Sequence, residues 1–225
     1  MLRFGFVVLL LLQSMPFRYS DFSNEISIVR KSFNKNYHTY QLNFTYPELI
    51  DRQNQKHIEL NLEVQGYMVE AISVFQEKVD MINNKNSFSY LNFDYNVCSN
   101  IEEALSLKFI KRSYHPGMNQ ALELNRTLNF DKRSGKIIHL SDLFLPNLDY
   151  ERKIIEIINK KFSTCKVPSK MRLTSFCIKE GGLVIVLNKQ VLPDDFCSDE
   201  VEITWRELQE MLNPESVAYL LANKR

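Results

Sequence analysis

The fold of this chain is organised around residues 108–144, which read KFIKRSYHPGMNQALELNRTLNFDKRSGKIIHLSDLF. Apolar and polar residues alternate within this stretch, as they do in β-strands that bury one face. One strand carries large apolar side chains on one side, at Leu122, Leu124, Leu128 and Phe130, and Arg126 interrupts that side. The turn residues 131–135 (Asp-Lys-Arg-Ser-Gly) then lead into a short apolar run, so the stretch predicts a β-hairpin.

A second strand is predicted upstream, where Leu105, Leu107 and Phe109 alternate in the same way. Residues 113–117 (Ser-Tyr-His-Pro-Gly) then link the two strands. Proline cannot donate a ladder hydrogen bond, and glycine adopts backbone angles that other residues avoid. The His-Pro-Gly corner is therefore expected to be an exposed turn.

The composition is that of a globular protein. A chain of 225 residues with 44% hydrophobic and 24% charged residues can bury a good core, as one domain or two small ones. The formal net charge is +1 with scattered Lys and Arg, which argues against a nucleic-acid partner. None of the six glycines lies in a phosphate-binding motif, so no nucleotide cofactor is indicated.

The N-terminal sequence predicts export. A basic tip at residues 1–3 precedes an apolar run at residues 4–12, which is shorter than the roughly 20 residues of a membrane span. We expect a signal peptide at residues 1–20, an extracytoplasmic (periplasmic or secreted) location, and no transmembrane span in the mature chain. Because no Ala-x-Ala cleavage site follows, an N-terminal strand or an uncleaved anchor is the alternative.

The first third of the mature chain predicts two strands and a helix. Alternating residues indicate strands at about 26–33 and 38–46, and Pro47 is expected to end the second. Apolar residues then recur at spacings of three and four over residues 51–83, which predicts one long amphipathic helix. We expect its apolar stripe to cover a sheet.

The later part of the chain predicts shorter elements. Strands are indicated at 91–98, 174–178, 183–188 and 201–205, and helices at 150–163 and 206–212. A two-glycine turn separates the strands that flank residues 179–182. The expected fold class is α+β, an antiparallel β-sheet packed by one long and one shorter amphipathic helix. Residues 21–98 would form the N-terminal strands and long helix, and residues 99–225 the C-terminal half.

Several short motifs follow one another in a specific order, over residues 40–212. They are Phe44-Thr-Tyr-Pro-Glu-Leu49 before the long helix, Tyr114-His-Pro116, Leu128-Asn-Phe-Asp131, Leu140-Ser-Asp-Leu-Phe144, Gly182-Leu-Val-Ile-Val-Leu187 and Trp205-Arg-Glu-Leu208. This order resembles the RsiV/PdaC-type extracytoplasmic domain family. That family includes the ectodomain of the RsiV anti-sigma factor and the N-terminal domain of PdaC-type peptidoglycan deacetylases.

The resemblance implies a compact α/β domain that works by binding outside the cytoplasm. In RsiV the corresponding domain captures lysozyme, and cell-wall glycan is a plausible ligand elsewhere in the family. Sigma-factor signalling and deacetylation are not expected of this stand-alone chain, because it is too short to hold an anti-sigma segment or a deacetylase domain beside the ectodomain. We therefore expect an exported, non-enzymatic binding domain whose partner is a protein such as lysozyme. The alternative is a module that binds peptidoglycan or another cell-envelope glycan.

The resemblance implies two partner-binding loops, and the first contains Tyr114, His115 and Pro116. These residues match a His-containing turn of the family, although the family has small residues where this chain has Ser113 and Tyr114. The residues by themselves allow another interpretation, in which His115 is a turn histidine held by local hydrogen bonds. For a glycan ligand, Tyr114 is a candidate for stacking on a sugar face.

The second loop begins at Pro193, which matches a proline in the family's closing loop. This chain continues with Asp194, Asp195 and Phe196, where the family commonly continues with Tyr and small residues. The two carboxylates suit a basic partner, and lysozymes are often basic. Phe196 is a second candidate for stacking on a sugar, and ordinary loop chemistry is the alternative for Pro193 and Asp194.

The chain has four cysteines, Cys98, Cys165, Cys177 and Cys197, and no CxxC motif. A zinc site of the usual spacing is therefore not indicated, and an exported chain with an even count suggests disulfides. Three pairings are open. Because Cys165 follows a helix and Cys177 ends a nearby strand, Cys165 with Cys177 and Cys98 with Cys197 is the favoured one.

The sequence shows no catalytic constellation. The four histidines have no HExxH spacing, and no GxSxG motif is present. Adjacent acids such as Asp194-Asp195 and Asp199-Glu200 could imitate a glycosidase pair, but that chemistry needs two carboxylates facing each other across a sugar. We therefore expect no enzymatic activity, no cofactor and no metal.

Overall fold

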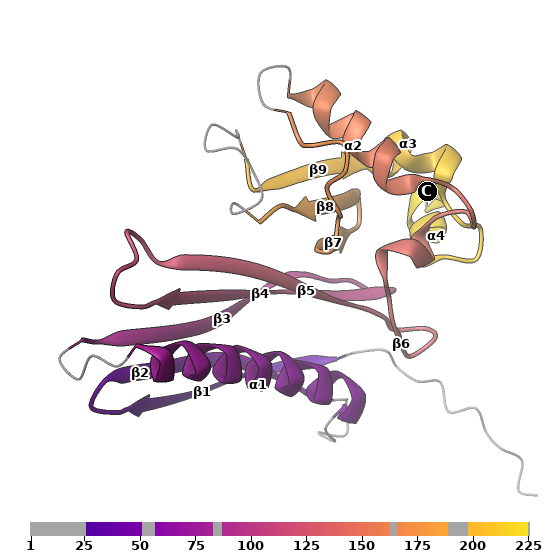
Figure 1. The fold of residues 1–225 in the computed structure, drawn as a ribbon. Coiled ribbons are helices and arrows are strands. Elements are labelled where there is room, and N and C mark those ends of the chain that lie inside the picture. The colour runs from indigo at the N-terminus through magenta and orange to yellow at the C-terminus, as the bar shows by residue number, and fades with distance from the viewer. Residues whose placement is uncertain (1–25, 51–56, 83–86, 163–165, 189–197, 225) are drawn as a thin grey trace, which may run out of the picture.

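The computed structural model describes residues 26–50, 57–82, 87–162, 166–188 and 198–224 (Figure 1). Its fold is α+β, as predicted, with nine strands in two sheets. The first sheet contains β1 (Ser27–Asn36), β2 (Tyr40–Ile50), β3 (Ser89–Asn100), β4 (Ala104–Tyr114), β5 (Leu122–Asp131) and β6 (Lys136–Ile137). The second contains β7 (Phe176–Lys179), β8 (Gly182–Val186) and β9 (Glu200–Thr204). The signal peptide predicted for residues 1–20 lies outside the described residues.

The helices are distributed unequally between the two sheets. One long helix, α1 (Ile58–Met81), accompanies the first sheet. The second sheet is accompanied by α2 (Tyr150–Lys161), α3 (Trp205–Leu208), α4 (Val217–Asn223) and the 3-10 turns η1 (Leu140–Leu143) and η3 (Gln209–Met211). None of the helices in the described part of the chain is long and apolar enough to cross a membrane.

The six strands of the first sheet are arranged in chain order, and all neighbours are antiparallel except one pair. Strands β2 and β3 run parallel, with Tyr40 opposite Ser89 and Phe44 opposite Phe93. Parallel neighbours need a long crossover, and α1 supplies it. The mainly antiparallel sheet was predicted, but the parallel pair was not.

Helix α1 covers one face of the first sheet, as its apolar stripe predicted. Buried residues of α1 at Leu60, Val64 and Phe75 meet buried strand residues such as Phe44 and Phe109 in one hydrophobic cluster. The helix begins at Ile58, later than predicted, and residues 51–56 lie outside the described chain.

Pro47 does not end β2, which continues to Ile50. The β2–β3 pairing stops at Phe44, so Pro47 lies where β2 has only β1 beside it. A residue without an N–H is tolerated there because hydrogen bonds are needed on one side of the strand only. The prediction of a strand end at Pro47 was therefore wrong.

The second sheet and its helices form the C-terminal lobe, on the opposite side of the first sheet from α1 (Figure 1). Every residue of β8 is buried. A two-residue turn joins β7 to β8, with Lys179 opposite Gly182, as the two glycines predicted. The N-cap Asp149 accepts a hydrogen bond from the Arg152 N–H and begins α2.

The lobe is attached to the first sheet through the free edge of β7. The Phe176 N–H donates to Thr127 Oγ1 at 2.9 Å, and Asn129 Nδ2 donates to the Phe176 carbonyl at 2.8 Å. The Ile178 N–H donates to Ser106 Oγ at 3.0 Å. Polar side chains on one sheet thus satisfy the backbone edge of the other, which would otherwise remain unpaired.

A disulfide crosses the same joint. It links Cys98 of β3 to Cys177 of β7, with the Cα atoms 6.1 Å apart. The predicted pairs Cys165–Cys177 and Cys98–Cys197 were therefore wrong, because proximity in sequence does not place two cysteines side by side. Cys165 and Cys197 lie outside the described residues.

Candidate binding cleft

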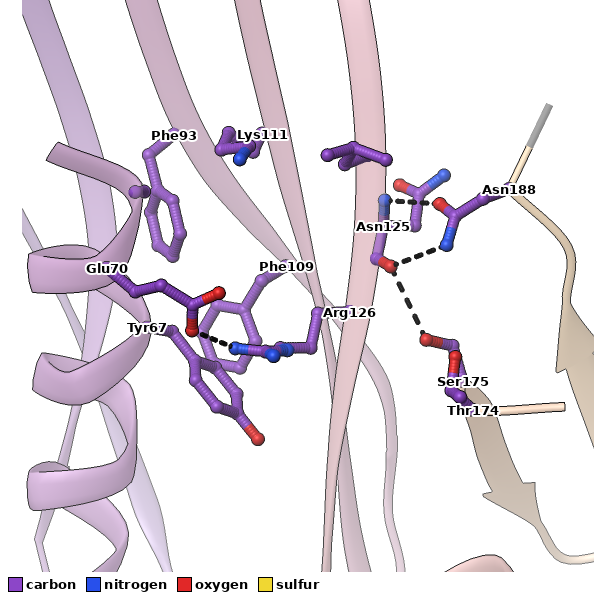
Figure 2. Close-up of a pocket in the computed structure, with 12 residues that line it drawn as sticks. Tyr67, Glu70, Phe93, Phe109, Lys111, Asn125, Arg126, Thr174, Ser175 and Asn188 are labelled. Carbon is purple, nitrogen blue, oxygen red and sulfur yellow. Dashed lines mark hydrogen bonds and ion pairs between the residues drawn. The ribbon is translucent and has the colours of Figure 1, made fainter. Parts of the chain in front are cut away.

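A cleft of about 320 Å³ lies where α1, the first sheet and the C-terminal lobe meet (Figure 2). Strand β6 pairs only with Phe130 and Asp131, so within the described chain the rest of β5 is an edge of the sheet. Phe93 and Phe109, which are buried with ring centroids 5.7 Å apart, form an apolar floor. The other residues that line the cleft are Tyr67, Glu70, Ala71, Lys111, Leu124, Asn125, Arg126, Thr174, Ser175 and Asn188.

The wall on the helix side is an ordered group of three side chains. Arg126 Nη1 lies 2.6 Å from Glu70 Oε2, and its guanidinium lies 4.6 Å from the centre of the Tyr67 ring (Figure 2). Tyr67 in turn meets Phe109 edge to face, with centroids 5.4 Å apart. Burial raises the pKa of the Tyr67 hydroxyl, although Arg126 opposes this shift, so the hydroxyl stays protonated and can donate.

Lys111 projects from β4 into the same cleft. Burial lowers the pKa of its ammonium, and Lys78 and Arg126 add to this effect while Glu70 opposes it. The ion pairs formed within the described chain do not include Lys111. The cleft therefore contains one paired cation, Arg126, and one unpaired cation.

The opposite wall of the cleft is formed where the Asn188 side chain hydrogen-bonds to the backbone edge of β5 at Asn125. The Asn125 N–H donates to Asn188 Oδ1 at 2.7 Å, and Asn188 Nδ2 donates back to the Asn125 carbonyl at 3.3 Å. Ser175 Oγ donates to the same carbonyl at 3.4 Å (Figure 2). Asn188 thus takes the place of a neighbouring strand and fixes the backbone of Asn125. The buried Asn125 Oδ1 receives no donor from the residues described.

This arrangement suits ligand binding. An apolar floor surrounded by a few fixed polar groups is typical of small-ligand sites. Within the described residues, no group of three or more His, Cys, Asp and Glu side chains is placed to hold a metal ion. Glu200, one of the acids that could imitate a glycosidase pair, instead forms an ion pair with Lys108.

The first predicted loop, with Tyr114, His115 and Pro116, was expected to be exposed, but its histidine is buried. His115 is only 5% exposed, and its ring stacks on Phe75 of α1 with centroids 4.8 Å apart. Neither ring nitrogen has a hydrogen-bond partner among the described residues. Local hydrogen bonds hold the His115 backbone instead: its N–H donates to Met118 Sδ at 3.3 Å, and its carbonyl accepts from the Met118 N–H at 3.1 Å. The prediction of an exposed corner was wrong for His115, because the helix packs over the end of β4 and encloses the ring.

The neighbours of His115 are more accessible. Tyr114 ends β4 half-buried, and its ring lies nearly parallel to that of Tyr90 with centroids 5.7 Å apart. Pro116 is half-buried, and Gly117 takes a φ of 93°, which favours glycine. Successive strand residues point to opposite faces, so Tyr114 faces away from the side on which Lys111 lines the cleft.

The second predicted loop, with Pro193, Asp194, Asp195 and Phe196, lies outside the described residues. Of the residues that do line the cleft, Arg126 had a signal in the sequence, because it interrupts an apolar side of a strand. Lys111 and Asn125 had none, since a lysine or an asparagine on a strand is common on ordinary surface.

No protein-family model matches this chain, and no curated protein does. Among the solved structures that match its fold are two crystal structures of DUF3298 proteins. A DUF3298 family protein from Pseudomonas aeruginosa PAO1 matches with a TM-score of 0.60 and 10% identity, over 84% of this chain and 94% of its own. A member of the DUF3298 family from Bacteroides fragilis NCTC 9343 matches with a TM-score of 0.59 and 14% identity, over 90% and 99%. The architecture described above is therefore that of DUF3298 proteins.

Proposed function

We propose that the chain is a non-enzymatic binding domain that works outside the cytoplasm, and that its cleft receives a saccharide of the cell envelope. The observation that carries this proposal is the cleft at β5, in which an aromatic floor lies below fixed amide, hydroxyl and charged groups. Sugars present apolar ring faces and many hydroxyls, so a site for them needs aromatic surface together with polar groups at its rim.

A further observation supports an extracytoplasmic location. The Cys98–Cys177 disulfide joins the two sheets, and structural disulfides persist mainly in oxidising compartments.

Capture of a protein such as lysozyme is the second candidate function. The observation that favours it is the aromatic pair Tyr90–Tyr114 beside Pro116, at the end of β4 and away from the cleft. Half-exposed tyrosines are frequent anchors of protein interfaces. In this alternative the partner meets Tyr114 and Pro116, and the acids Asp194 and Asp195 contribute charge attraction.

Calorimetry with two ligand panels tests both candidates. The first panel contains oligosaccharides and soluble peptidoglycan fragments, and the second contains lysozymes, whose residual muramidase activity is read in parallel. We expect saccharide binding that Tyr67→Ala or Arg126→Gln weakens about tenfold, because each substitution removes roughly 1 to 1.5 kcal/mol of contact. Tyr114→Ala, outside the cleft, is the control and should leave saccharide affinity unchanged.

The two functions give opposite patterns in this experiment. Tight one-to-one binding to a lysozyme with loss of its activity, abolished by Tyr114→Ala and unaffected by Arg126→Gln, would replace the saccharide with a protein partner. Turnover of any saccharide during the titration would overturn the non-enzymatic part of the proposal. Thermal melts of each variant separate a lost contact from a lost fold.

A further inference from the structure

The charges of the described residues that line the cleft do not balance. Lys111 and Arg126 are cations, and Glu70 is the single carboxylate among those described residues. Glu70 is held by Arg126 at 2.6 Å, so its charge is already matched. One positive charge, that of Lys111, is left over. Figure 2 shows the Lys111 amine apart from the Glu70–Arg126 pair, with no interaction drawn to it.

Two other sheet lysines form ion pairs. Lys31 lies 3.3 Å from Glu48, and Lys108 forms an ion pair with Glu200 on the face of β4 opposite to Lys111. Lys111 is half-buried beside the aromatic floor, where water solvates an ammonium less well than at an open surface. A cation held in this way gains free energy when an anion enters the cleft beside it.

The chemical group that carries the unpaired positive charge indicates which kind of anion the cleft would bind. The guanidinium fork of Arg126, the group best suited to a phosphate, is already taken by Glu70. The remaining cation is a single ammonium, which matches a monovalent carboxylate better than a dianion. Resting on the saccharide function proposed above, we infer that the cleft is specific for carboxylate-bearing sugars, whose carboxylate pairs with Lys111.

The test compares matched ligands on the whole exported chain by calorimetry. The probes are a peptide-free muramyl oligosaccharide, which carries a lactyl carboxylate, the same oligosaccharide with that carboxyl reduced to an alcohol, and an oligogalacturonate of equal length. We expect the wild-type chain to bind the carboxylate form at least tenfold more tightly than its reduced form, with an affinity that falls as salt is added. In Lys111→Met this preference should disappear, while the reduced form binds as before.

Lys153→Met is the matched control, because Lys153 is exposed on α2 in the other lobe and its loss changes the net charge equally. It should keep the tenfold preference. An oligogalacturonate that binds as tightly as the muramyl form, with an affinity that is lost in Lys111→Met, would also support the inference. The cleft would then recognise a carboxylate on either sugar.

The outcomes separate this inference from the proposed function. Equal affinity for the carboxylate and reduced forms, in both the wild type and Lys111→Met, would overturn the role of Lys111 and leave a saccharide-binding cleft. A preference that Lys153→Met abolishes as well would overturn it too, since the effect would then come from net charge. Absence of binding to every oligosaccharide, with the chain folded, would overturn both proposals together.

Discussion

The two halves of the molecule bury their sheets in different ways. The first sheet has long strands whose residues alternate, as in β2, where Leu42, Phe44 and Leu49 face the core and their neighbours are partly exposed. The sheet of the C-terminal lobe has strands of five residues or fewer, and β8 is buried on both faces. One half is a sheet covered by a single helix, and the other is a small core enclosed by several short helices.

Because each half has its own core, the connection between the halves depends on the contact of the first sheet with the C-terminal lobe. The first sheet has α1 and a hydrophobic cluster of its own, and the lobe has a second, separate cluster. Between the two clusters lie polar side chains and one disulfide rather than a shared apolar core. Inter-domain contacts of this kind allow each half to respond separately to a perturbation. The predictions below use the single tryptophan, Trp205, as a reporter of the lobe, and circular dichroism as a reporter of the whole chain.

Removal of the disulfide should have the largest effect. Cys98 and Cys177 close a loop with a sequence separation of 79, and freeing it is expected to cost about 4 kcal/mol of unfolding free energy. In Cys98→Ser/Cys177→Ser, urea should unfold the lobe first, so Trp205 fluorescence changes before the circular dichroism. A single coincident transition of unchanged midpoint would contradict the role of the disulfide. Non-reducing peptide mapping should recover Cys98 linked to Cys177.

Gly182→Ala should damage the lobe alone. A Cβ at Gly182 would lie 2.1 Å from the Ile203 carbonyl oxygen, so β8 and β9 could not keep their present separation. We expect a loss of about 3 kcal/mol, measured by urea unfolding followed through Trp205. Gly181→Ala is the matched control, because nothing lies within 4 Å of a Cβ there. Equal stability of the two variants would show that the β8–β9 contact is adaptable.

Ser106→Ala tests the polar joint. Ser106 Oγ accepts from the Ile178 N–H and donates to Asn129 Oδ1 at 2.6 Å, and both side chains are buried. Loss of the hydroxyl leaves both partners unsatisfied, so we expect a cost of about 2 kcal/mol in the unfolding free energy. Ser32→Ala, on exposed β1, is the control and should change little. A neutral result for Ser106→Ala would mean that the joint does not need this bond.

The smallest effect should be a pH dependence in the first sheet. Burial lowers the pKa of His115 below its usual value of 6.5, and Lys78 adds to the shift. The unfolded chain therefore binds more protons in this window, and stability should fall as pH decreases from 6.5 towards the lower folded pKa. His115→Phe should remove this dependence between pH 6.5 and 5, and His38→Gln, in the exposed β1–β2 turn, should leave it in place. Thermal melts at constant ionic strength measure it.

The local patterns of the sequence determined most of the elements. Alternation in β5 and the turn at Gly135, the three-and-four spacing of α1, and the two-glycine turn before Gly182 are set by interactions between residues close in the chain. These interactions act whatever the rest of the chain does, so the α+β class could be predicted from sequence. Arg126 was visible as well, as a charge on an apolar side.

The tertiary structure decided what is brought together from distant segments. The parallel β2–β3 pair, the Cys98–Cys177 disulfide, and the burial of His115 against Phe75 all join residues that sequence spacing leaves unrelated. The cleft also depends on the tertiary structure, since Lys111 becomes a half-buried cation without an ion-pair partner among the described residues only once the first sheet has formed and α1 covers it. Burial is a property of the assembled fold, and burial is what turns an ordinary polar side chain into a binding group.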